Sequence, residues 1–272
     1  MTQTVPAGPR APRRPVSTWL RPTLQIAFVI LAVVIGFRHQ GCAHTSPSPC
    51  SFDTSCPFGG VATSWRIMAD GVFLRDTGPS NLILLGLLLL AALLTGRAFC
   101  GWACPLGTVQ DWLATLARRL TGGRKAWLPI TPPRWLDRPL RLGKYLLLAW
   151  VIWQSATALL PPLQPFCPYR TLFTLNTRSL LGWSILVGFI VLSLVVERFW
   201  CRYLCPLGAL LALTNKISLW HIRADQTACI ACGRCDRACP MGLDVVREVE
   251  RGLECTRCRA CVQACPKDQA LS

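Results

Sequence analysis

Eight of the sixteen cysteines in this chain lie near its C-terminal end, in two runs of identical spacing. Each run has the pattern Cys-x-x-Cys-x-x-Cys-x-x-x-Cys-Pro, and its cysteines are Cys229, Cys232, Cys235 and Cys239 in the first and Cys255, Cys258, Cys261 and Cys265 in the second. Cysteine thiolates bind the irons of iron–sulfur clusters, and this doubled spacing is typical of chains that hold two [4Fe–4S] clusters. We therefore predict one-electron redox chemistry in this part of the chain.

The fourth cysteine of each run lies too far along the chain to reach the cluster held by the first three, so it binds the other cluster. The predicted ligands are Cys229, Cys232, Cys235 and Cys265 for cluster one, and Cys255, Cys258, Cys261 and Cys239 for cluster two. Zinc is the alternative metal, but zinc sites usually pair two short cysteine pairs across a gap. The doubled spacing therefore favours iron–sulfur clusters over zinc. Because it is the spacing of bacterial ferredoxins, we expect residues 215–272 to form an α+β domain like a bacterial ferredoxin.

Four further cysteines belong to a shorter motif, Cys-x-x-x-Cys-Pro, which occurs at residues 100–105 and again at 201–206. They are Cys100, Cys104, Cys201 and Cys205. Residues four apart share one face of a helix, and the proline disfavours continuation of that helix at the second cysteine. If the two pairs converge, they bind a third metal centre or form redox-active disulfides; otherwise they are small packing residues at a turn. The sequence leaves these alternatives open.

The elements that position these motifs are four apolar runs, at residues 23–37, 80–96, 142–160 and 180–196. The chain is 52% hydrophobic and only 15% charged, whereas a soluble domain carries about 25% charged residues. Each run is close to the lower limit of the roughly 17–25 residues that span a bilayer as a helix. We therefore expect an α-helical membrane protein in which residues 23–214 form a four-transmembrane-helix bundle, preceded by a disordered basic tail at residues 1–22.

Lysine and arginine alternate between the segments that separate these runs. The segments before run one, between runs two and three, and after run four are rich in them, and the other two segments are poor. Because positive residues stay on the cytoplasmic side, we expect both termini and the middle segment to be cytoplasmic, in an inner or plasma membrane. The net charge of +16 follows this pattern, and no nucleic-acid-binding motif accompanies it. We therefore expect membrane lipid, and no nucleic acid, as a partner.

The membrane part contains an internal repeat. Each copy consists of an apolar run, an outward loop with a Cys-Pro pair, a second apolar run and the inward Cys-x-x-x-Cys-Pro motif. This order predicts two repeated hairpins in a parallel arrangement. The outward loops carry Cys42, Cys50, Cys56 and Cys167. An oxidising compartment favours disulfides there, so these cysteines are expected to form structural bridges or to have a redox role, and the sequence does not separate the two.

On the four apolar runs, the two Cys-x-x-x-Cys-Pro motifs and the two cysteine runs, the chain resembles a known family from residue 23 to its end. It is similar to the NapH/MauN group of membrane ferredoxin-type proteins, which is related to the membrane portion of the nitrous-oxide reductase regulator NosR. The resemblance implies a 4Fe–4S quinol dehydrogenase membrane component. Such a protein passes electrons between the quinone pool and another redox protein, which is a reductase, a dehydrogenase or a cytochrome subunit.

The resemblance leaves two roles open for this chain. In electron transfer it is expected to be either a non-catalytic carrier or a quinol-oxidising subunit of an oxidoreductase system. Some relatives act in the assembly of a metalloenzyme, so the alternative function is a maturation factor that reduces a metal or a disulfide. The sequence contains no Cys-x-x-Cys-His haem motif, which assigns any haem to a partner chain.

Overall fold

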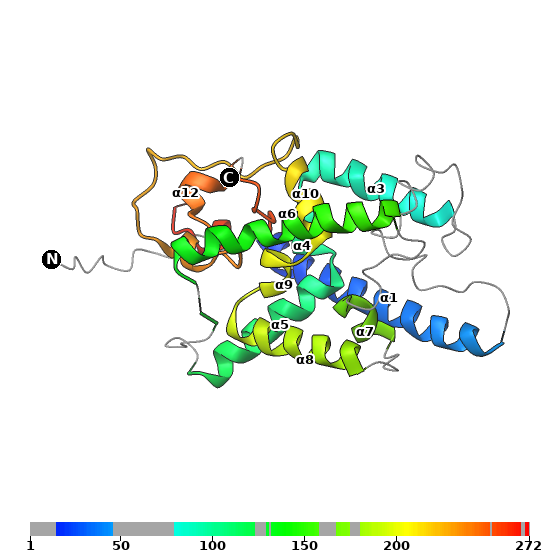
Figure 1. The fold of residues 1–272 in the computed structure, drawn as a ribbon. Coiled ribbons are helices and arrows are strands. Elements are labelled where there is room, and N and C mark those ends of the chain that lie inside the picture. Colours follow the sequence, from blue (N-terminus) through cyan, green and yellow to red (C-terminus); the bar gives the residue numbers. More distant parts are fainter. Residues whose placement is uncertain are drawn as a thin grey trace.

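The computed structural model describes residues 15–45, 79–122, 129–130, 132–157, 167–174, 180–250, 252–267 and 270–271. The chain is mostly helical in these parts (Figure 1). The four predicted apolar runs correspond to four long helices, which are α1 (Pro15–Thr45), α3 (Pro79–Thr95), α6 (Arg134–Thr157) and α8 (Leu180–Val195). Helix α3 and the C-terminal half of α1 lie toward one end of the molecule, and the C-terminal part around α12 lies toward the opposite end (Figure 1).

The other helices connect these four and build the C-terminal part. They are α4 (Ala98–Trp102), α5 (Pro105–Leu120), α7 (Pro168–Thr174), α9 (Phe199–Tyr203), α10 (Pro206–Thr214), α11 (Arg234–Arg237), α12 (Val245–Glu248) and α13 (Ala260–Ala264). Pro105 and Pro206 occupy the start of α5 and α10, where a missing N–H costs no hydrogen bond. Cys104 and Cys205 precede them in extended conformation. Each Cys-x-x-x-Cys-Pro motif therefore bends the chain from one short helix into the next.

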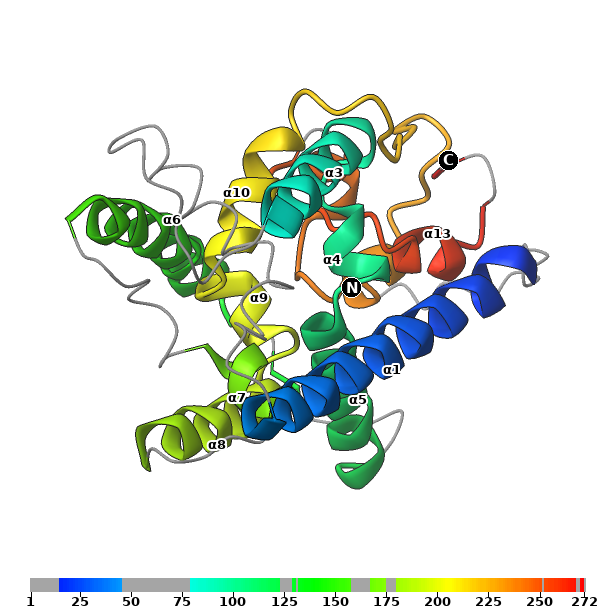
Figure 2. The same ribbon diagram turned by 90° about the vertical axis from the view of Figure 1, so that its right-hand side faces the viewer.

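Helices of one repeat pack against helices of the other. Helix α5 of the first repeat packs against α8 of the second, and α10 of the second packs against α3 of the first. Helix α1 contacts α4 and α5 in the same way that α6 contacts α9 and α10 (Figure 2). Because these contacts of one repeat have counterparts in the other, the two copies follow a pseudo-twofold arrangement, and the Cys-x-x-x-Cys-Pro motifs lie where the copies meet. Helix α7, which contacts α1 and α8, has no counterpart in the described part of the first repeat.

Helix α1 is longer than the apolar run predicts. It begins at Pro15, so the expected boundary of a disordered tail at residue 22 falls inside a helix, and residues 1–14 lie outside the described parts. The Arg21 guanidinium forms an ion pair with Asp111 at 2.8 Å and donates to the carbonyl of Gly101 at 3.2 Å. Gln25 donates to the same two residues. These partners lie about 80 to 90 residues away along the chain, which is why a local pattern does not reveal them.

By length and composition, one helix of the described residues is able to span a membrane, at Trp19–Arg38. Helices α3 and α8 contain shorter apolar stretches, Leu82–Thr95 and Leu180–Val195, and 17 or 16 residues measure only about 25 Å at 1.5 Å per residue, against a hydrocarbon core of about 30 Å. Helix α6 carries Arg138, Arg141 and Lys144 in its first half. A bundle of four membrane spans is therefore not established by these lengths.

The C-terminal part has a small core of its own. Buried apolar side chains pack between the cysteines, namely Ile222, Met241, Leu243, Val245, Val249 and Leu271. The expected α+β character is reduced: within the described residues the only β pairing is the antiparallel bridge between Ala224 and Leu271. Asp225 N–H also donates to Ala270 O at 3.0 Å. These contacts join residues 224–225 to residues 270–271, at the two ends of the C-terminal part. The described loops between them carry the cysteines and do not form longer strands.

Candidate iron–sulfur centre

The eight C-terminal cysteines surround two separate cavities. The larger, of about 410 Å³, includes in its lining Cys229, Cys232, Cys235 and Cys265. The smaller includes Cys239, Cys255, Cys258 and Cys261. Each cavity takes three cysteines from one run and the fourth from the other, which is the grouping that the spacing predicts. Four thiols around one cavity are the donor set of a [4Fe–4S] cluster, so the residues present fit that group.

The backbone between the cysteines has an unusual conformation at equivalent positions of both runs. Ala231 and Arg257, each two residues after the first cysteine of its run, both have a φ of 51°. Gly233 and Arg259, each directly after the second cysteine, have φ of 64° and 59°. Positive φ is uncommon for a non-glycine residue, and such strain persists where the surrounding structure enforces it. These left-handed residues curl both runs around their cavities, as closely spaced ligands of one group require.

Burial disfavours ionisation of these thiols. It raises the pKa of Cys235 to about 11, and the neighbouring carboxylate of Asp236 adds to the effect. Burial also raises the pKa of Cys239 to about 11, with Cys258 adding to it. Iron binds thiolates, and metal binding to cysteine releases protons. The binding of iron is therefore coupled to proton release at both cavities.

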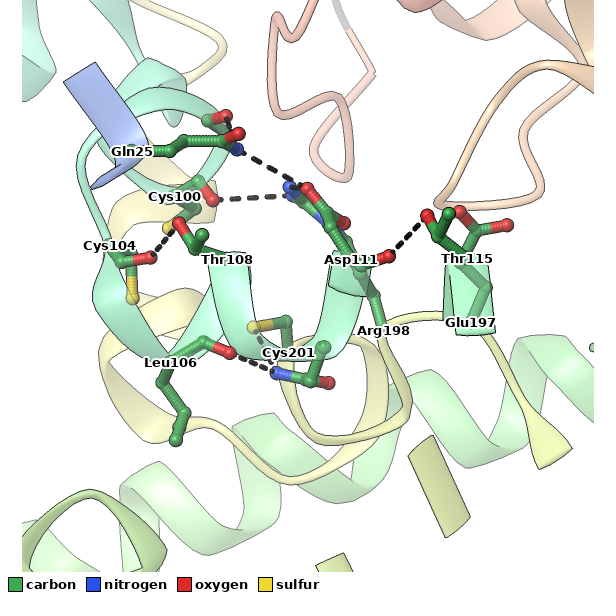
Figure 3. A network of polar contacts seen from close by, with 12 residues as sticks. Gln25, Cys100, Cys104, Leu106, Thr108, Asp111, Thr115, Glu197, Arg198 and Cys201 are labelled. Carbon is green, nitrogen blue, oxygen red and sulfur yellow. Dashed lines mark hydrogen bonds and ion pairs between the residues drawn. The ribbon is translucent and has the colours of Figure 1, made fainter. Parts of the chain in front are cut away.

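The structure brings the four Cys-x-x-x-Cys-Pro cysteines, here called the thiol quartet, into one neighbourhood. Cys100 and Cys201 are buried, Cys104 and Cys205 are half-buried, and all four are free thiols. Burial raises the pKa of Cys205 well above its ordinary value, and Cys201, Cys100 and Cys104 raise it further because they lie close by. The Gln110 amide donates to Cys201 Sγ at 3.2 Å. Cys100, Cys104 and Cys201 are seen together in Figure 3.

Two buried arginines connect the halves of the thiol quartet. Arg97 and Arg198 each stand three residues before the first cysteine of a motif, and both are fully buried. Arg97 Nη2 donates to the carbonyl of Cys201 at 3.4 Å, and Arg198 Nη1 donates to the carbonyl of Cys100 at 3.2 Å. Each repeat thus supplies an arginine to the main chain of the other.

Each of these arginines is neutralised by a carboxylate. Arg97 pairs with Glu254 at 2.8 Å. Arg198 pairs with Asp111 at 2.7 Å, and Figure 3 shows these two side chains together. Burial tends to raise the pKa of Asp111, but Arg198 and Arg21 outweigh it and hold the pKa below its ordinary value. The sequence analysis predicted neither carboxylate. The sequence indicates that Glu254 lies near this site only by its place, directly before the first cysteine of the second run.

A third ion-pair group lies beside these two. Asp137 accepts from Arg202 at 2.6 Å, from Arg141 at 2.5 Å and from the hydroxyl of Tyr203 at 2.6 Å. Lys144 and Tyr145 of the same helix, α6, contact Glu254. Asp137, Arg141 and Lys144 of α6 are therefore paired inside the protein.

The thiol quartet adjoins the second cavity and not the first. A Cβ atom added to Gly101 would lie 2.5 Å from the carbonyl oxygen of Thr256 and 3.3 Å from Cys258 Cβ. The Trp102 indole donates to the carbonyl of Arg257 at 3.0 Å. Asn215, which follows α10, donates to the carbonyl of Cys255 at 2.9 Å. The second cavity thus faces the helical repeats.

The remaining predicted site residues are less completely described. Cys167 is half-buried and directly precedes α7. Cys42 lies in the last turn of α1, but its side chain, like Cys50 and Cys56, is outside the described residues. Disulfides in the outward loops therefore stay a prediction. In the parts that are described, no three His, Cys, Asp or Glu side chains stand close enough to bind one metal ion. This holds for the quartet and also for the eight cluster cysteines, whose thiols would share the several irons of a cluster, and a third metal centre stays a prediction.

Two family models match the chain. One, described as a 4Fe-4S binding domain, matches residues 77–124 and 179–224, which contain the two Cys-x-x-x-Cys-Pro motifs. The other, described as a 4Fe-4S dicluster domain, matches residues 221–266. No solved structure shows a significant match.

Several named proteins are similar over most of the chain. YccM of Escherichia coli is 37% identical over 211 residues, which cover 73% of this chain and 57% of YccM. The ferredoxin-type protein NapH of Haemophilus influenzae is 30% identical over 201 residues, or 69% of this chain and 67% of NapH. The methylamine utilization ferredoxin-type protein MauN of Methylorubrum extorquens is 31% identical over 171 residues, or 59% of this chain and 54% of MauN. The chain therefore spans little more than half of the length of YccM and MauN.

The cysteine-lined cavities and the matching family models define a ferredoxin-type protein with 4Fe–4S binding domains. Among proteins of this class, the chain belongs to the NapH/MauN family, as its identity and coverage with NapH establish.

Proposed function

We propose that this protein is a multi-pass membrane subunit that passes electrons between the quinone pool and another redox protein through two [4Fe–4S] clusters. Iron–sulfur electron transport is the function that the family relationship supports. The observation that carries the finer proposal is the contact of Gly101 and Trp102 with the loop of Cys258. It joins the thiol quartet, at the end of the apolar helices, to the predicted ligands of cluster two.

The surfaces of the long helices support a membrane location. Large apolar side chains are exposed on all four, and examples are Ile30 at 57%, Ile83 at 63%, Leu146 at 71% and Leu180 at 91%. Contiguous apolar surface of this kind marks contact with lipid or with a partner. Asp137, Arg141 and Lys144, near the N-terminal end of α6, bind one another or Glu254, which leaves the apolar second half of that helix for the bilayer. Short spans are accommodated by local thinning of the bilayer.

We propose an order for the electron path. The thiol quartet forms a redox site at the cytoplasmic rim, next to cluster two and its ligands Cys255, Cys258, Cys261 and Cys239. Cluster one, with Cys229, Cys232, Cys235 and Cys265, lies farther from the repeats. Ile230, between two of its ligands, is 50% exposed, so this cluster is the one that a soluble redox partner reaches.

Anaerobic purification of the full chain in detergent tests this function. Two [4Fe–4S] clusters correspond to about eight irons per chain, and iron analysis with EPR spectroscopy counts them. Addition of a reduced quinol analogue should reduce a cluster, or an oxidised quinone should reoxidise the dithionite-reduced protein. Zinc in place of iron would contradict the cofactor, and clusters that exchange no electrons with quinol or quinone would contradict the proposed donor.

A second function is favoured by the four free thiols of the quartet. A maturation factor would use them to reduce a metal ion or a disulfide on a client protein, with the clusters supplying electrons. Cupric ions and a disulfide-containing peptide, added to the reduced protein without quinone, test this alternative. Rapid cluster oxidation by either reagent, with loss of that reaction in Cys201→Ser, would favour maturation over quinone-linked transfer.

A further inference from the structure

We infer that Arg257 is the electrostatic partner of cluster two, and that it gives cluster two a higher reduction potential than cluster one. The inference rests on the proposed ligand sets, and it is independent of the quinone. It concerns a difference between two sites that the doubled cysteine spacing would otherwise make equivalent.

The internal repeat provides the comparison. Arg257 and Ala231 occupy the same position of their runs and share a φ of 51°. The left-handed conformation at this position is therefore compatible with alanine, so backbone conformation is not the reason for an arginine at position 257. The surroundings differ: Ala231 is exposed, and Arg257 is 2% exposed and lines the second cavity together with Cys255 and Cys258.

The charge of Arg257 lacks a carboxylate partner among the described residues. Its Nη2 donates to the carbonyl of Asn215 at 3.3 Å and to Ser218 Oγ at 2.5 Å. Its Nε and Nη1 have no hydrogen-bond partner in the described part of the chain. The other fully buried arginines of this region, Arg97 and Arg198, each have an ion pair.

A buried and unpaired guanidinium is costly unless a negative group lies nearby, and arginine does not lose its proton in proteins. A cluster bound by four thiolates carries negative charge and gains one more negative charge on reduction. The anionic cluster is therefore the counter-ion that completes this site. A fixed cation beside it stabilises the reduced form more than the oxidised form, which raises the reduction potential, since local charge is one determinant of cluster potentials.

Cluster one has the opposite surroundings. Two half-buried carboxylates, from Asp236 and Asp244, line its cavity, together with the exposed carboxylate of Asp225. Cys235 Sγ lies 3.7 Å from Asp236 Oδ1. The cations of that cavity are Arg247 and Lys267, and both are exposed. Solvent and salt screen exposed charges, whereas Arg257 acts from the protein interior. The first electron that enters the protein is therefore expected to reside on cluster two, the cluster that adjoins the helical repeats.

An EPR-monitored redox titration of the detergent-purified protein tests the inference, with dithionite as the electron donor. The variants Cys232→Ser and Cys258→Ser assign each signal to its cluster. In the unchanged protein, cluster two should be reduced at the higher potential. Arg257→Met should lower the reduction potential of cluster two by about 59 mV. For a one-electron couple, this shift corresponds to an about tenfold lower ratio of reduced to oxidised cluster at a given potential. Arg257→Lys should retain most of the wild-type potential, and the potential of cluster one should not move.

The reciprocal change, Ala231→Arg, should raise the potential of cluster one by a smaller amount, because residue 231 is exposed. The potentials of the two clusters in the unchanged protein and in Ala231→Arg test the inference even if Arg257→Met fails to assemble cluster two. The inference is overturned if cluster one has the higher potential in the unchanged protein. It is also overturned if Arg257→Met and Arg257→Lys shift cluster two equally, which would indicate that Arg257 only docks the C-terminal part. Failure of quinol to reduce a protein that shows the predicted shifts would contradict the proposed function alone.

Discussion

Arg198 Nη1 lies 3.2 Å from the carbonyl oxygen of Cys100, although the two residues belong to different repeats. The guanidinium is fully buried and bridges that carbonyl to the carboxylate of Asp111. Arg97 makes the equivalent contact with Cys201. These crossed contacts hold the thiol quartet together from both sides, so its geometry depends on buried charge pairs that lie outside the cysteine motifs.

Asp111→Asn should destabilise the protein strongly at pH 7. The change removes the carboxylate that neutralises Arg198 and Arg21, and breaking a buried pair on one side costs about 3–5 kcal/mol. Thermal unfolding in detergent, followed by circular dichroism, measures the effect. Glu197→Gln is the control, because its partner Arg118 is 42% exposed and exposed pairs contribute at most about 1 kcal/mol. Equal shifts for the two variants would contradict the role of the buried pair.

The same pair predicts a pH dependence. The folded-state pKa of Asp111 is held below its ordinary value by Arg198 and Arg21 against the effect of burial. A carboxylate with a lowered folded pKa contributes stability above its unfolded pKa of about 3.9, and this stability is lost as the pH falls through the folded value. The gap in melting temperature between the unchanged protein and Asp111→Asn should be constant above about pH 5 and should narrow below about pH 4. A gap that widens in acid would refute this assignment.

Gly101→Ala should impair the contact between the thiol quartet and cluster two. The new methyl group would lie 2.5 Å from Thr256 O, and such overpacking typically costs about 1–3 kcal/mol. We expect both clusters to assemble and quinol-linked reduction of cluster two to slow, as stopped-flow spectroscopy would show. Gly188→Ala is the matched control, because nothing lies within 4 Å of its added Cβ. An unchanged rate in Gly101→Ala would indicate that electrons do not pass through this contact.

Cys232→Ser and Cys258→Ser should each remove or convert one cluster and leave the other in place. Each serine replaces a predicted ligand in a different cavity. Iron content should fall from about eight towards about four per chain when a cubane is lost, and EPR spectra should retain the signal of the unaffected cluster. If one variant removed both signals while the helical part stayed folded, the two ligand sets would not be independent.

Single changes of Cys100, Cys104, Cys201 and Cys205 to serine should separate a redox role from packing. A shared redox site predicts loss of quinol-linked electron transfer while both C-terminal clusters remain assembled. Burial raises the pKa of Cys201 and outweighs Arg198 and Arg97, which act to lower it, so the unliganded quartet is held as thiols and a redox role must release their protons. Full activity in all four variants would instead assign the quartet to packing at the turns before Pro105 and Pro206.

Reporter fusions test the proposed topology. Fusions at Thr63 and Asn176 should report an extracytoplasmic position, and fusions at Arg124 and Ser272 a cytoplasmic one, because the Lys and Arg counts alternate along the chain. An outside C-terminus would refute the orientation. Thiol labelling of intact cells adds a second observation, since the outward cysteines Cys42, Cys50, Cys56 and Cys167 should be largely oxidised in that compartment.

The sequence alone predicted the grouping of the eight C-terminal cysteines that the two cavities display. Such a prediction is possible because ligand reach is set by short separations along the chain: three cysteines with two residues between each pair curl around one site, and a fourth farther on reaches the next. The long helices were predictable for a similar reason, because apolar runs are local. Their ends were less so: α1 begins at Pro15, before the apolar run, and Arg21 in this added part forms an ion pair with Asp111.

The tertiary structure decided what lies around those cysteines. Asp111 and Glu254 neutralise Arg198 and Arg97 across about 90 and 160 residues of chain, and no periodicity or spacing encodes such partners. Arg257 and Ala231 hold equivalent places in the sequence, but one is buried against the helical repeats and the other faces solvent. Spacing specifies which thiols share a site because it constrains nearby residues. The electrostatic surroundings of that site depend on which distant segments fold against it, and only the packed structure brings those segments together.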